Sequence, residues 1–566
     1  MQQSSASKRQ KRLFHDKNIW ISVLIVSAPA FILGFMSGLF AFCDQLMMVK
    51  IIPEFMNVNE VWKDTVYTDY TNISDPNNLL MHFANEKDAI ASILRTSVAY
   101  SAPVTVLINA AALLMGNGTA INYSKYSGAK NLPMAERTWT QGFWANMVFS
   151  VLMTIIICGS CQALISLEQG QGLSNSLDTI KNSGNFSQEE IATITSFYTS
   201  FYEQTRLFAS QYIYIMGGAC VFALYSQFIT YLVIAEGKQT MVILAAFLCN
   251  GINILLDFLL IKYGKLEMMG GGISTDIGWF LNTALCFSYV FYLYKRNDTN
   301  LNLIALKKIN FIVKDYGFLV ALGLPSFLRN SSMAVAATIQ LSLIVAVATH
   351  TSEEQASTYQ NIYGATNAIY NLSFTALFGI INGSRIICSY NYGARDFKRV
   401  RWSYLVNIVY ALVYGTMMYF VVCYAANTWL LSLFDVSPTS GNNVFKTANY
   451  ILQISMLQMP VMAIGIGGMT LFQATGRWWQ ASIAGVMQGV ICCLPISFLM
   501  QWICIKYTNI DLFLWVPLVI AGVATIANLI WSIIYIKLHF QDTHAIDLIK
   551  MEQKNIHTNL ASKNSK

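Results

Sequence analysis

Long apolar stretches recur along most of this chain and constrain its fold more than any other feature. A helix needs about 20 consecutive apolar residues to cross the hydrocarbon core of a membrane. Stretches of this length alternate with short polar segments from Asn18 to Leu538, and only 11% of the 566 residues are charged. So few charges leave too little polar surface for a water-soluble protein. We therefore predict an all-α polytopic membrane protein with twelve transmembrane helices, at 19–52, 88–115, 138–166, 207–235, 239–262, 270–294, 316–349, 357–391, 401–434, 445–474, 478–505 and 512–537.

The positions of the charged residues predict the orientation of these spans. Basic residues precede the first span, the next loop is acidic, and basic clusters then return in every second major loop, as the positive-inside rule requires. Both termini are therefore expected in the cytoplasm. Because the net charge of +7 is spread over alternate loops, a nucleic-acid partner is not expected. The basic clusters are Lys8 to Lys17, Lys125 to Arg137, Lys295 to Lys308 and Arg395 to Arg401.

The two halves of the chain repeat each other. Three segments of the first half match three segments of the second half, in the same order. Within the first span of each half, Pro29 to Ile32 matches Pro325 to Leu328. After the second span, Gly118 and Gly128 to Asn131 match Gly383 and Gly393 to Asp396, and after the fourth span, Ala235 to Lys238 matches Ala474 to Arg477. Because each half has six spans, the two repeats share one orientation and are related by an axis along the membrane normal. The expected divisions are a cytoplasmic tail at 1–18, a six-helix lobe at 19–294, a cytoplasmic linker at 295–315, a second six-helix lobe at 316–537 and a cytoplasmic tail at 538–566.

These segments resemble the MATE (multidrug and toxic compound extrusion) family, within the superfamily of multidrug, oligosaccharidyl-lipid and polysaccharide flippases. The most specific is Ile381 to Ser384 leading to Tyr390 to Arg395; Asn253 to Asp257 followed by Gly270 to Thr275, and Gly323 to Arg329, add to it. The resemblance covers nearly the whole chain and implies two pseudo-symmetric six-helix lobes with a cleft between them. The loops at 53–87 and 167–206 are long for the family, and the sequence assigns them no role.

Carboxylates inside the predicted spans are the strongest functional signal. Each costs about 2.5–3.5 kcal/mol at the centre of a membrane helix on insertion scales, so it needs a functional reason. Asp44, Asp257 and Asp276 lie within spans of the first half, and the spans of the second half contain no acid. Asp44 and Asp257 are expected at a similar depth, and Asn253 shares one helical face with Asp257, four residues later.

The resemblance implies that Asp44, Asn253, Asp257 and Thr275 form the family's cation site in the N-terminal lobe. Oxygen ligands suit Na⁺, for which Asp44 and Asp257 are the candidate ligands, and a desolvated aspartate suits a proton equally well, so the coupling ion stays open. In the repeat, Gln340 and Ile496 stand where Asp44 and Asp257 stand, which predicts ion coupling in the N-terminal lobe alone. Further candidates for a polar cavity are Gln227, Thr230, Asp276, Arg329 and Gln340. For Arg329, a substrate or lobe contact and a snorkelling anchor are both open.

The expected function is therefore an antiporter of the plasma membrane that exports drugs or other amphipathic or cationic small molecules in exchange for H⁺ or Na⁺. The alternative is a flippase of lipid-linked oligosaccharides or lipid precursors. We expect neither an enzyme nor a cofactor, and the chain has no phosphate-binding Gly-x-x-x-x-Gly-Lys motif for an ATP-driven pump. The expected partners are drug-like substrates and the lipid bilayer, and the protein is expected to be a monomer. Methionines at 333, 456, 459, 462 and 469 are candidates for the cleft lining, with packing against lipid as the alternative for each.

Overall fold

The fold is entirely helical in the part of the chain that the computed structural model describes, residues 5–63, 65–75, 79–83, 85–169, 172–307, 313–351, 356–434 and 442–539. Eleven segments in this part are long and apolar enough to cross a membrane, and a twelfth is formed by α8 and α9, which meet at a bend of 50°. The predicted twelve-span, all-α class is confirmed. Lys308 and residues 540–566 of the predicted C-terminal tail lie outside the described residues. The spans are α2 (Ile19–Ile51), α5 (Glu86–Gly128), α6 (Leu132–Gln169), α8 (Gln188–Gly218) with α9 (Cys220–Ala235), α10 (Gln239–Phe258), α11 (Glu267–Lys295), α12 (Val313–Thr351), α13 (Ala356–Gly393), α14 (Phe397–Phe420), α16 (Asn442–Ala474), α17 (Trp478–Val486) with α18 (Cys493–Lys506), and α20 (Val516–His539).

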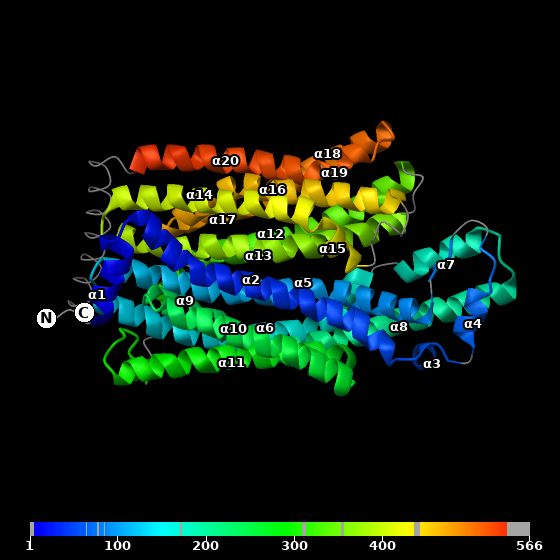
Figure 1. The fold of residues 1–566 in the computed structure, drawn as a ribbon, viewed down its shortest axis with the longest axis horizontal. Helices are drawn as coiled ribbons and strands as arrows, with labels where there is room; N and C mark the ends of the chain where they lie inside the picture. The colour runs from blue at the N-terminus through cyan, green and yellow to red at the C-terminus, as the bar shows by residue number, and fades with distance from the viewer. Residues whose placement is uncertain are drawn as a thin grey trace.

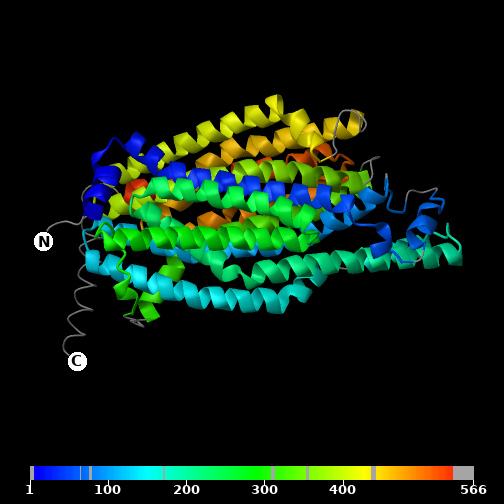
Figure 2. The ribbon, with the colours of Figure 1, turned by 60° about the horizontal axis from the view of Figure 1, so that its bottom comes forward.

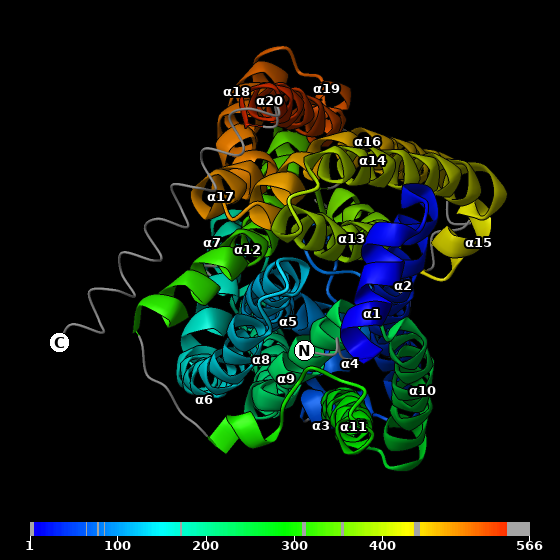
Figure 3. The ribbon, with the colours of Figure 1, turned by 90° about the vertical axis from the view of Figure 1, so that its left-hand side faces the viewer.

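The spans form two groups that follow the two halves of the sequence. Viewed along the helices, α2 to α11 gather on one side and α12 to α20 on the other, with α2 and α5 next to α12 and α13 (Figure 3). Large apolar side chains such as Ile155, Leu255 and Ile526 are more than half exposed on the outside of the bundle, as expected for a surface that faces lipid tails. We call the end of the bundle that carries α1 (Ser5–Lys11) the inner end and the opposite end the outer end (Figure 1).

Reciprocal contacts across the lobe interface reveal the internal repeat in three dimensions. On α5, the Ser124 hydroxyl donates to the Ile386 carbonyl at 2.9 Å, and on α13 the Ser389 hydroxyl donates to the Ile121 carbonyl at 2.6 Å. Each residue of one hydrogen bond stands 265 positions from its counterpart in the other, so the two bonds are related by the repeat. The repeated turns also match, because Gly237 and Gly476 both have positive φ, of 78° and 83°.

The long outer segment expected as a loop at 167–206 is largely helical, and the one at 53–87 contains two short α-helices. The two segments contain α3 (Val58–Val61), α4 (Val66–Thr71), α7 (Gly172–Asn182) and the first turns of α8, which extend the bundle at its outer end (Figure 2). A capping box between Ser187 and Glu190 begins α8. Such a box marks the start of a helix locally and does not depend on a long apolar stretch. The Phe197 ring stacks between Trp62 and Tyr70, with ring centroids 4.7 and 3.7 Å away, so aromatic packing holds the extension together.

Residues 5–17, predicted only as a tail, form an N-terminal strap across both lobes at the inner end. Arg9 on α1 makes an ion pair with Asp298 at 2.9 Å in the N-terminal half. The next turn (Arg12–Asp16) contacts the C-terminal lobe, because Asn391 and Arg399 both donate hydrogen bonds to the Phe14 carbonyl. The Phe14 side chain is fully buried. The strap therefore joins the two lobes at one end of the molecule.

A candidate cation site in the N-terminal lobe

Two buried aspartates meet at one turn of α11. Asp44 comes from α2 and Asp257 from α10, and both are almost fully buried. The Asp257 carboxylate accepts a hydrogen bond from the Ser274 hydroxyl, which also donates to the Gly271 carbonyl at 2.8 Å. The other carboxylate lies against the same turn, since a Cβ atom on Gly271 would stand 2.5 Å from Asp44 Oδ1. Glycine at position 271 thus makes room for the Asp44 carboxylate.

The other two residues of the predicted site lie next to this pair. Asn253, one turn before Asp257 on α10, points its amide Nδ2 at Thr275 Oγ1, 3.5 Å away on α11. Both side chains are buried. The structure thus brings Asp44, Asn253, Asp257 and Thr275 together from three helices.

Three acceptor oxygens of this group point at no hydrogen-bond donor in the described part of the chain: Asp44 Oδ1, Asp257 Oδ2 and Asn253 Oδ1. Buried acceptors without donors are costly, and a cation bound among them, or a proton on one carboxyl, would satisfy them. A set of carboxylate and amide oxygens is suited to a hard monovalent cation. No group of three or more His, Cys, Asp or Glu side chains with metal-binding geometry occurs among the described residues, so a transition-metal site is not indicated there.

Sequence reasoning missed two residues of the site. The Tyr212 hydroxyl of α8 donates to Asp44 Oδ2 at 3.1 Å, and Ser274 holds the other carboxylate. Ser274 could have been found, because it directly precedes Thr275 in the glycine-rich start of α11. Tyr212 carries no comparable signal, since one tyrosine in an apolar span is common and its partner is 168 residues away.

The remaining candidates in this lobe occupy neighbouring positions. Thr230 on α9 accepts a hydrogen bond from Asn282 Nδ2 at 3.2 Å, and Asn282 also donates to Ser226 Oγ at 2.6 Å. This second polar cluster lies further along the buried face of α11 that holds Gly271, Thr275 and Gly278. Gln227 and Asp276 are half-buried, and each has one buried oxygen without a donor among the described residues.

Arg329 and Gln340 are not part of this site, because both lie on α12 in the other lobe. Gln340 accepts a hydrogen bond from the Tyr363 hydroxyl at 3.2 Å and lies near Cys493. It lines a small cavity within the C-terminal lobe. Arg329 lines a different cavity of that lobe.

A buried carboxylate outside the spans stabilises the inner end of the lobe. Glu236, in the turn between α9 and α10, accepts hydrogen bonds from the Tyr123 hydroxyl, from the Thr299 hydroxyl at 2.9 Å and from the Asn300 backbone N–H at 3.2 Å. Burial raises the pKa of Glu236 above the usual range of a glutamate, although these hydrogen bonds act in the opposite direction. This cluster fixes the linker after α11 to the turn at Gly237.

Comparison with known proteins finds similarity to transporters. A family model described as MatE matches residues 333–503. An uncharacterized protein of Mycoplasmoides gallisepticum, a homolog of MG447, is 29% identical over 93% of this chain and 91% of its own. The multidrug export protein MepA of Staphylococcus aureus is 25% identical over 44% of this chain and 51% of its own.

Solved structures agree on the fold. The outward-facing conformation of a multidrug resistance MATE family transporter of the MOP superfamily superposes with a TM-score of 0.70 at 17% identity, covering 94% of this chain and 98% of that one. A MATE crystal structure in complex with MaL6 gives 0.67 at 16% identity over 94% and 99%. Two six-helix lobes with buried polar sites define a polytopic membrane protein with the fold of these MATE structures. The MatE family model, which matches residues 333–503, makes the chain similar to the MATE family in sequence as well.

Proposed function

We propose that this protein is an antiporter that exports amphipathic small molecules across the plasma membrane by alternating access, coupled to H⁺ or Na⁺ entry at the Asp44 and Asp257 carboxylates. In this proposal the protein works as a monomer, and the inner end with the N-terminal strap faces the cytoplasm. The six-helix lobes at 19–294 and 316–537 are its moving parts, and the linker at 295–315 joins them.

The observation that carries the proposal is that α2 belongs to the site and to the lobe interface at once. Asp44 lies near the outer end of α2, while Ala30 and Gly34 of the same helix pack against Gly379 and Thr375 of α13. A Cβ on Gly34 would stand 2.4 Å from the Thr375 carbonyl oxygen, so this contact leaves no free space. Such packing transmits a shift of α2 rather than absorbing it. A cation that changes the position of Asp44 would therefore change how the lobes fit together.

The driving force is sufficient for accumulation of substrate. One elementary charge that moves down the membrane potential releases about 2.3 kcal/mol per 100 mV. Since about 1.4 kcal/mol corresponds to a tenfold ratio, one coupled cation supports a substrate gradient greater than tenfold.

The test is gradient-driven transport by purified protein in liposomes. Rhodamine 123 and fluorescein, a cationic and an anionic dye, are supplied separately, and Na⁺ and proton gradients are imposed one at a time. We expect one gradient to drive uptake of at least one dye, and Asp44→Asn and Asp257→Asn to lower the driven rate at least tenfold.

Asp511→Asn is the matched control, because Asp511 is an exposed aspartate at the start of the short helix α19 (Asp511–Leu514) in the other half of the chain. Its rate should equal that of the wild type. Gradient-driven transport that survives in both site variants would refute the coupling role of the two aspartates, and absence of transport with either dye and either gradient would refute the antiporter.

A further inference from the structure

A buried arginine that makes no ion pair with any described residue lies in the middle of the C-terminal lobe. Arg329 of α12 is only 4% exposed, and its guanidinium carbon lies 3.9 Å from the centre of the Phe378 ring. Its Nε and Nη2 donate to Asn330 Oδ1 at 3.3 and 3.2 Å. Its Nη1 is buried and donates to no acceptor within the described residues.

A second buried arginine reinforces this positive charge. Arg385 of α13 is fully buried, and its Nη1 donates to Ser326 Oγ at 3.0 Å. Its Nε and Nη2 find no acceptor in the part of the chain that the structure describes. Ser326 stands three residues before Arg329 on α12, so the two guanidinium groups lie in the same region of the lobe. Arg385 was not among the candidates from sequence, although it is an arginine within the apolar stretch 357–391.

Within the described residues, no carboxylate pairs with either arginine. The acids between 316 and 537 are Glu353, Glu354, Asp396, Asp435 and Asp511, and each lies between two predicted spans. No ion pair with either arginine occurs among the described residues. A buried charge without a counter-charge costs several kcal/mol, so an arginine in such a place is typical of a functional site that receives its counter-charge from outside the chain.

A small cavity adjoins Arg329. Its lining includes Met333, Phe378, Met469, Gln488 and Asn528, an apolar wall with two amide side chains. Asn528 Oδ1 has no hydrogen-bond donor among the described residues.

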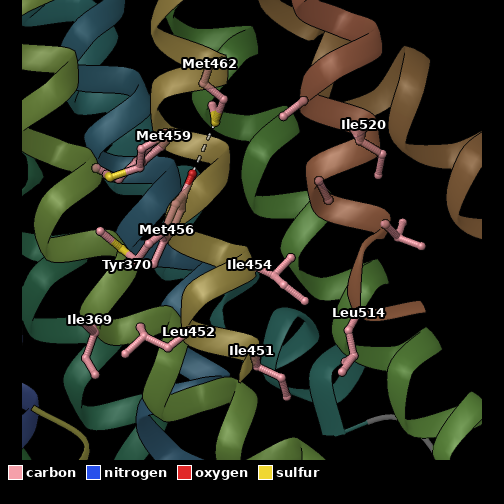
Figure 4. Close-up of a cluster of buried hydrophobic side chains, with 14 of the residues drawn as sticks. Ile369, Tyr370, Ile451, Leu452, Ile454, Met456, Met459, Met462, Leu514 and Ile520 are labelled. Atoms are coloured by element: carbon pink, nitrogen blue, oxygen red, sulfur yellow. Dashed lines mark hydrogen bonds between the residues drawn. The ribbon is translucent and has the colours of Figure 1, made fainter. Parts of the chain in front are cut away.

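Four of the five methionines considered from sequence are packed inside the lobe and not against lipid, whereas Met333 is half-buried. Those at 456, 459, 462 and 469 are buried within the lobe, and the Tyr370 hydroxyl fixes Met462 by donating to its sulfur at 3.3 Å (Figure 4). Met462 and Met469 line the cavity.

We propose that this cavity binds the negatively charged oxygen group of an amphipathic substrate, with Arg329 as its direct ligand and Arg385 as a second source of positive potential. The inference deepens the proposed function, on which it rests, by naming the charge of the substrate. A guanidinium with a free Nη1 matches carboxylate, sulfonate and phosphate oxygens, with which arginine makes short charge-assisted hydrogen bonds. Methionine and phenylalanine walls accept an apolar body of variable shape.

The sign of the charge separates the two sites of the molecule. The N-terminal lobe offers acceptor oxygens that attract a cation, whereas the C-terminal cavity offers donors that repel one. Cationic substrates, expected from the sequence, would meet like charge at Arg329 and Arg385. We therefore expect anionic amphiphiles in this cavity, with the cation confined to the other lobe.

The experiment measures binding of fluorescein and rhodamine 123 to purified protein by fluorescence anisotropy. Both dyes contain a xanthene ring system but differ in charge. We expect the wild type to bind fluorescein, and Arg329→Gln to lower its affinity at least tenfold without weakening rhodamine 123. Arg385→Gln should lower it several-fold, and Arg329→Lys should retain an intermediate affinity. Arg206→Gln, which removes one exposed arginine of α8, should bind as the wild type.

Thermal unfolding of the wild type supplies a readout that does not depend on any variant, because a ligand that binds the native state raises the midpoint. Fluorescein should raise the midpoint of the wild type and not that of Arg329→Gln.

Soluble dihexanoylphosphatidylglycerol is added as a competitor. If it displaces fluorescein, the anionic group in the cavity can be a lipid phosphate, and if it does not, the site selects free amphiphiles. The proposal is overturned by failure of the wild type to bind fluorescein, or by fluorescein binding that both arginine variants leave unchanged.

The outcome is independent of the antiporter proposal. Asp257→Asn should keep fluorescein binding while it loses gradient-driven transport. If Arg329-dependent binding persists and no gradient drives transport, the antiporter fails and the anion site stands. If transport depends on Asp257 but neither binding nor transport depends on Arg329, the antiporter stands and the anion site fails.

Discussion

Gly271 is the residue on which the geometry of the two aspartates depends most directly. A Cβ at this position would meet Asp44 Oδ1 at 2.5 Å and Met48 Sδ at 3.2 Å. Overpacking of this kind costs about 1–3 kcal/mol, and here the carboxylate must move. We therefore expect Gly271→Ala to lower gradient-driven transport at least tenfold in the liposome assay while the protein stays folded. Gly251→Ala on α10 should be neutral, since a Cβ there meets no atom within 4 Å. Equal activity of the two variants would show that the position of Asp44 is unimportant.

Glu236 predicts a pH dependence of stability. Its folded-state pKa is raised by burial, so the folded state holds this proton more tightly than the unfolded chain does. Its contribution to stability is then fully present below the unfolded value of about 4.3 and is lost as pH rises through the folded value. We expect Glu236→Gln, which cannot ionise, to flatten the fall of the unfolding midpoint that the wild type shows as pH rises above about 4.3. Parallel pH profiles for the two proteins would contradict the assignment.

The sequence predicted the ionisable residues of the site better than their partners. Asp44 and Asp257 were visible because an acid in an apolar span is costly and therefore stands out from its neighbours. Tyr212 and Ser274 were not recognised from sequence, since their hydroxyl groups reach the aspartates only when α8 and α11 pack beside them. Gln340 was a candidate for a polar cavity, and it lines a small cavity of the C-terminal lobe, where it accepts a hydrogen bond from Tyr363.

At the scale of helices, the lengths of the apolar stretches predicted the membrane spans well, but not the helical turns that continue beyond the spans. The predicted span 239–262 agrees closely with α10 and its last π-helical turn, which end at Tyr263. The span predicted at 88–115 continues to Gly128 in α5, because its inner turns pack on α13 instead of lipid and need no apolar surface all round. The outer helices and the strap were missed for the same reason. Their stability comes from contacts with distant parts of the chain, such as Phe14 against Tyr390.

The strap predicts a test of how the inner end is held closed. Arg399 Nη2 donates to the Phe14 and Lys17 carbonyls at 3.2 and 2.8 Å, and hydrogen bonds from a charged group contribute about 1.5–3 kcal/mol. We expect Arg399→Gln to speed amide hydrogen exchange in residues 5–17 at least tenfold. Arg401→Gln, on the same turn of α14, is the control and should leave exchange unchanged. An equally protected strap in both variants would mean that Arg399 does not hold it.

At the scale of the whole molecule, the repeat explains why glycines recur where the lobes meet. Gly128 faces the Tyr390 carbonyl and Gly393 faces the Lys125 carbonyl, so that each lobe contributes the same contact to the other. The sequence predicted the repeat from these glycines but not the contacts themselves, because similarity between two segments does not say that they touch. A symmetric interface of backbone against backbone can separate and close again as two rigid surfaces.

Gly323 offers a way to bias that movement. A Cβ there would stand 1.7 Å from the Leu114 carbonyl oxygen, so Gly323→Ala must push α12 away from α5. A cost of about 1–3 kcal/mol in the closed state would raise the population of states that are open at the inner end about fivefold or more.

Ser389→Cys supplies the reporter, since the Ser389 hydroxyl reaches the Ile121 carbonyl across the interface. We expect a membrane-impermeant maleimide, applied from the side of the inner end, to label Ser389→Cys several-fold faster when Gly323→Ala is also present. Gly317→Ala, on the same helix but with no atom within 4 Å of its Cβ, should not change the rate. If the two alanine variants label alike, contact between α5 and α12 does not limit the opening of the inner end.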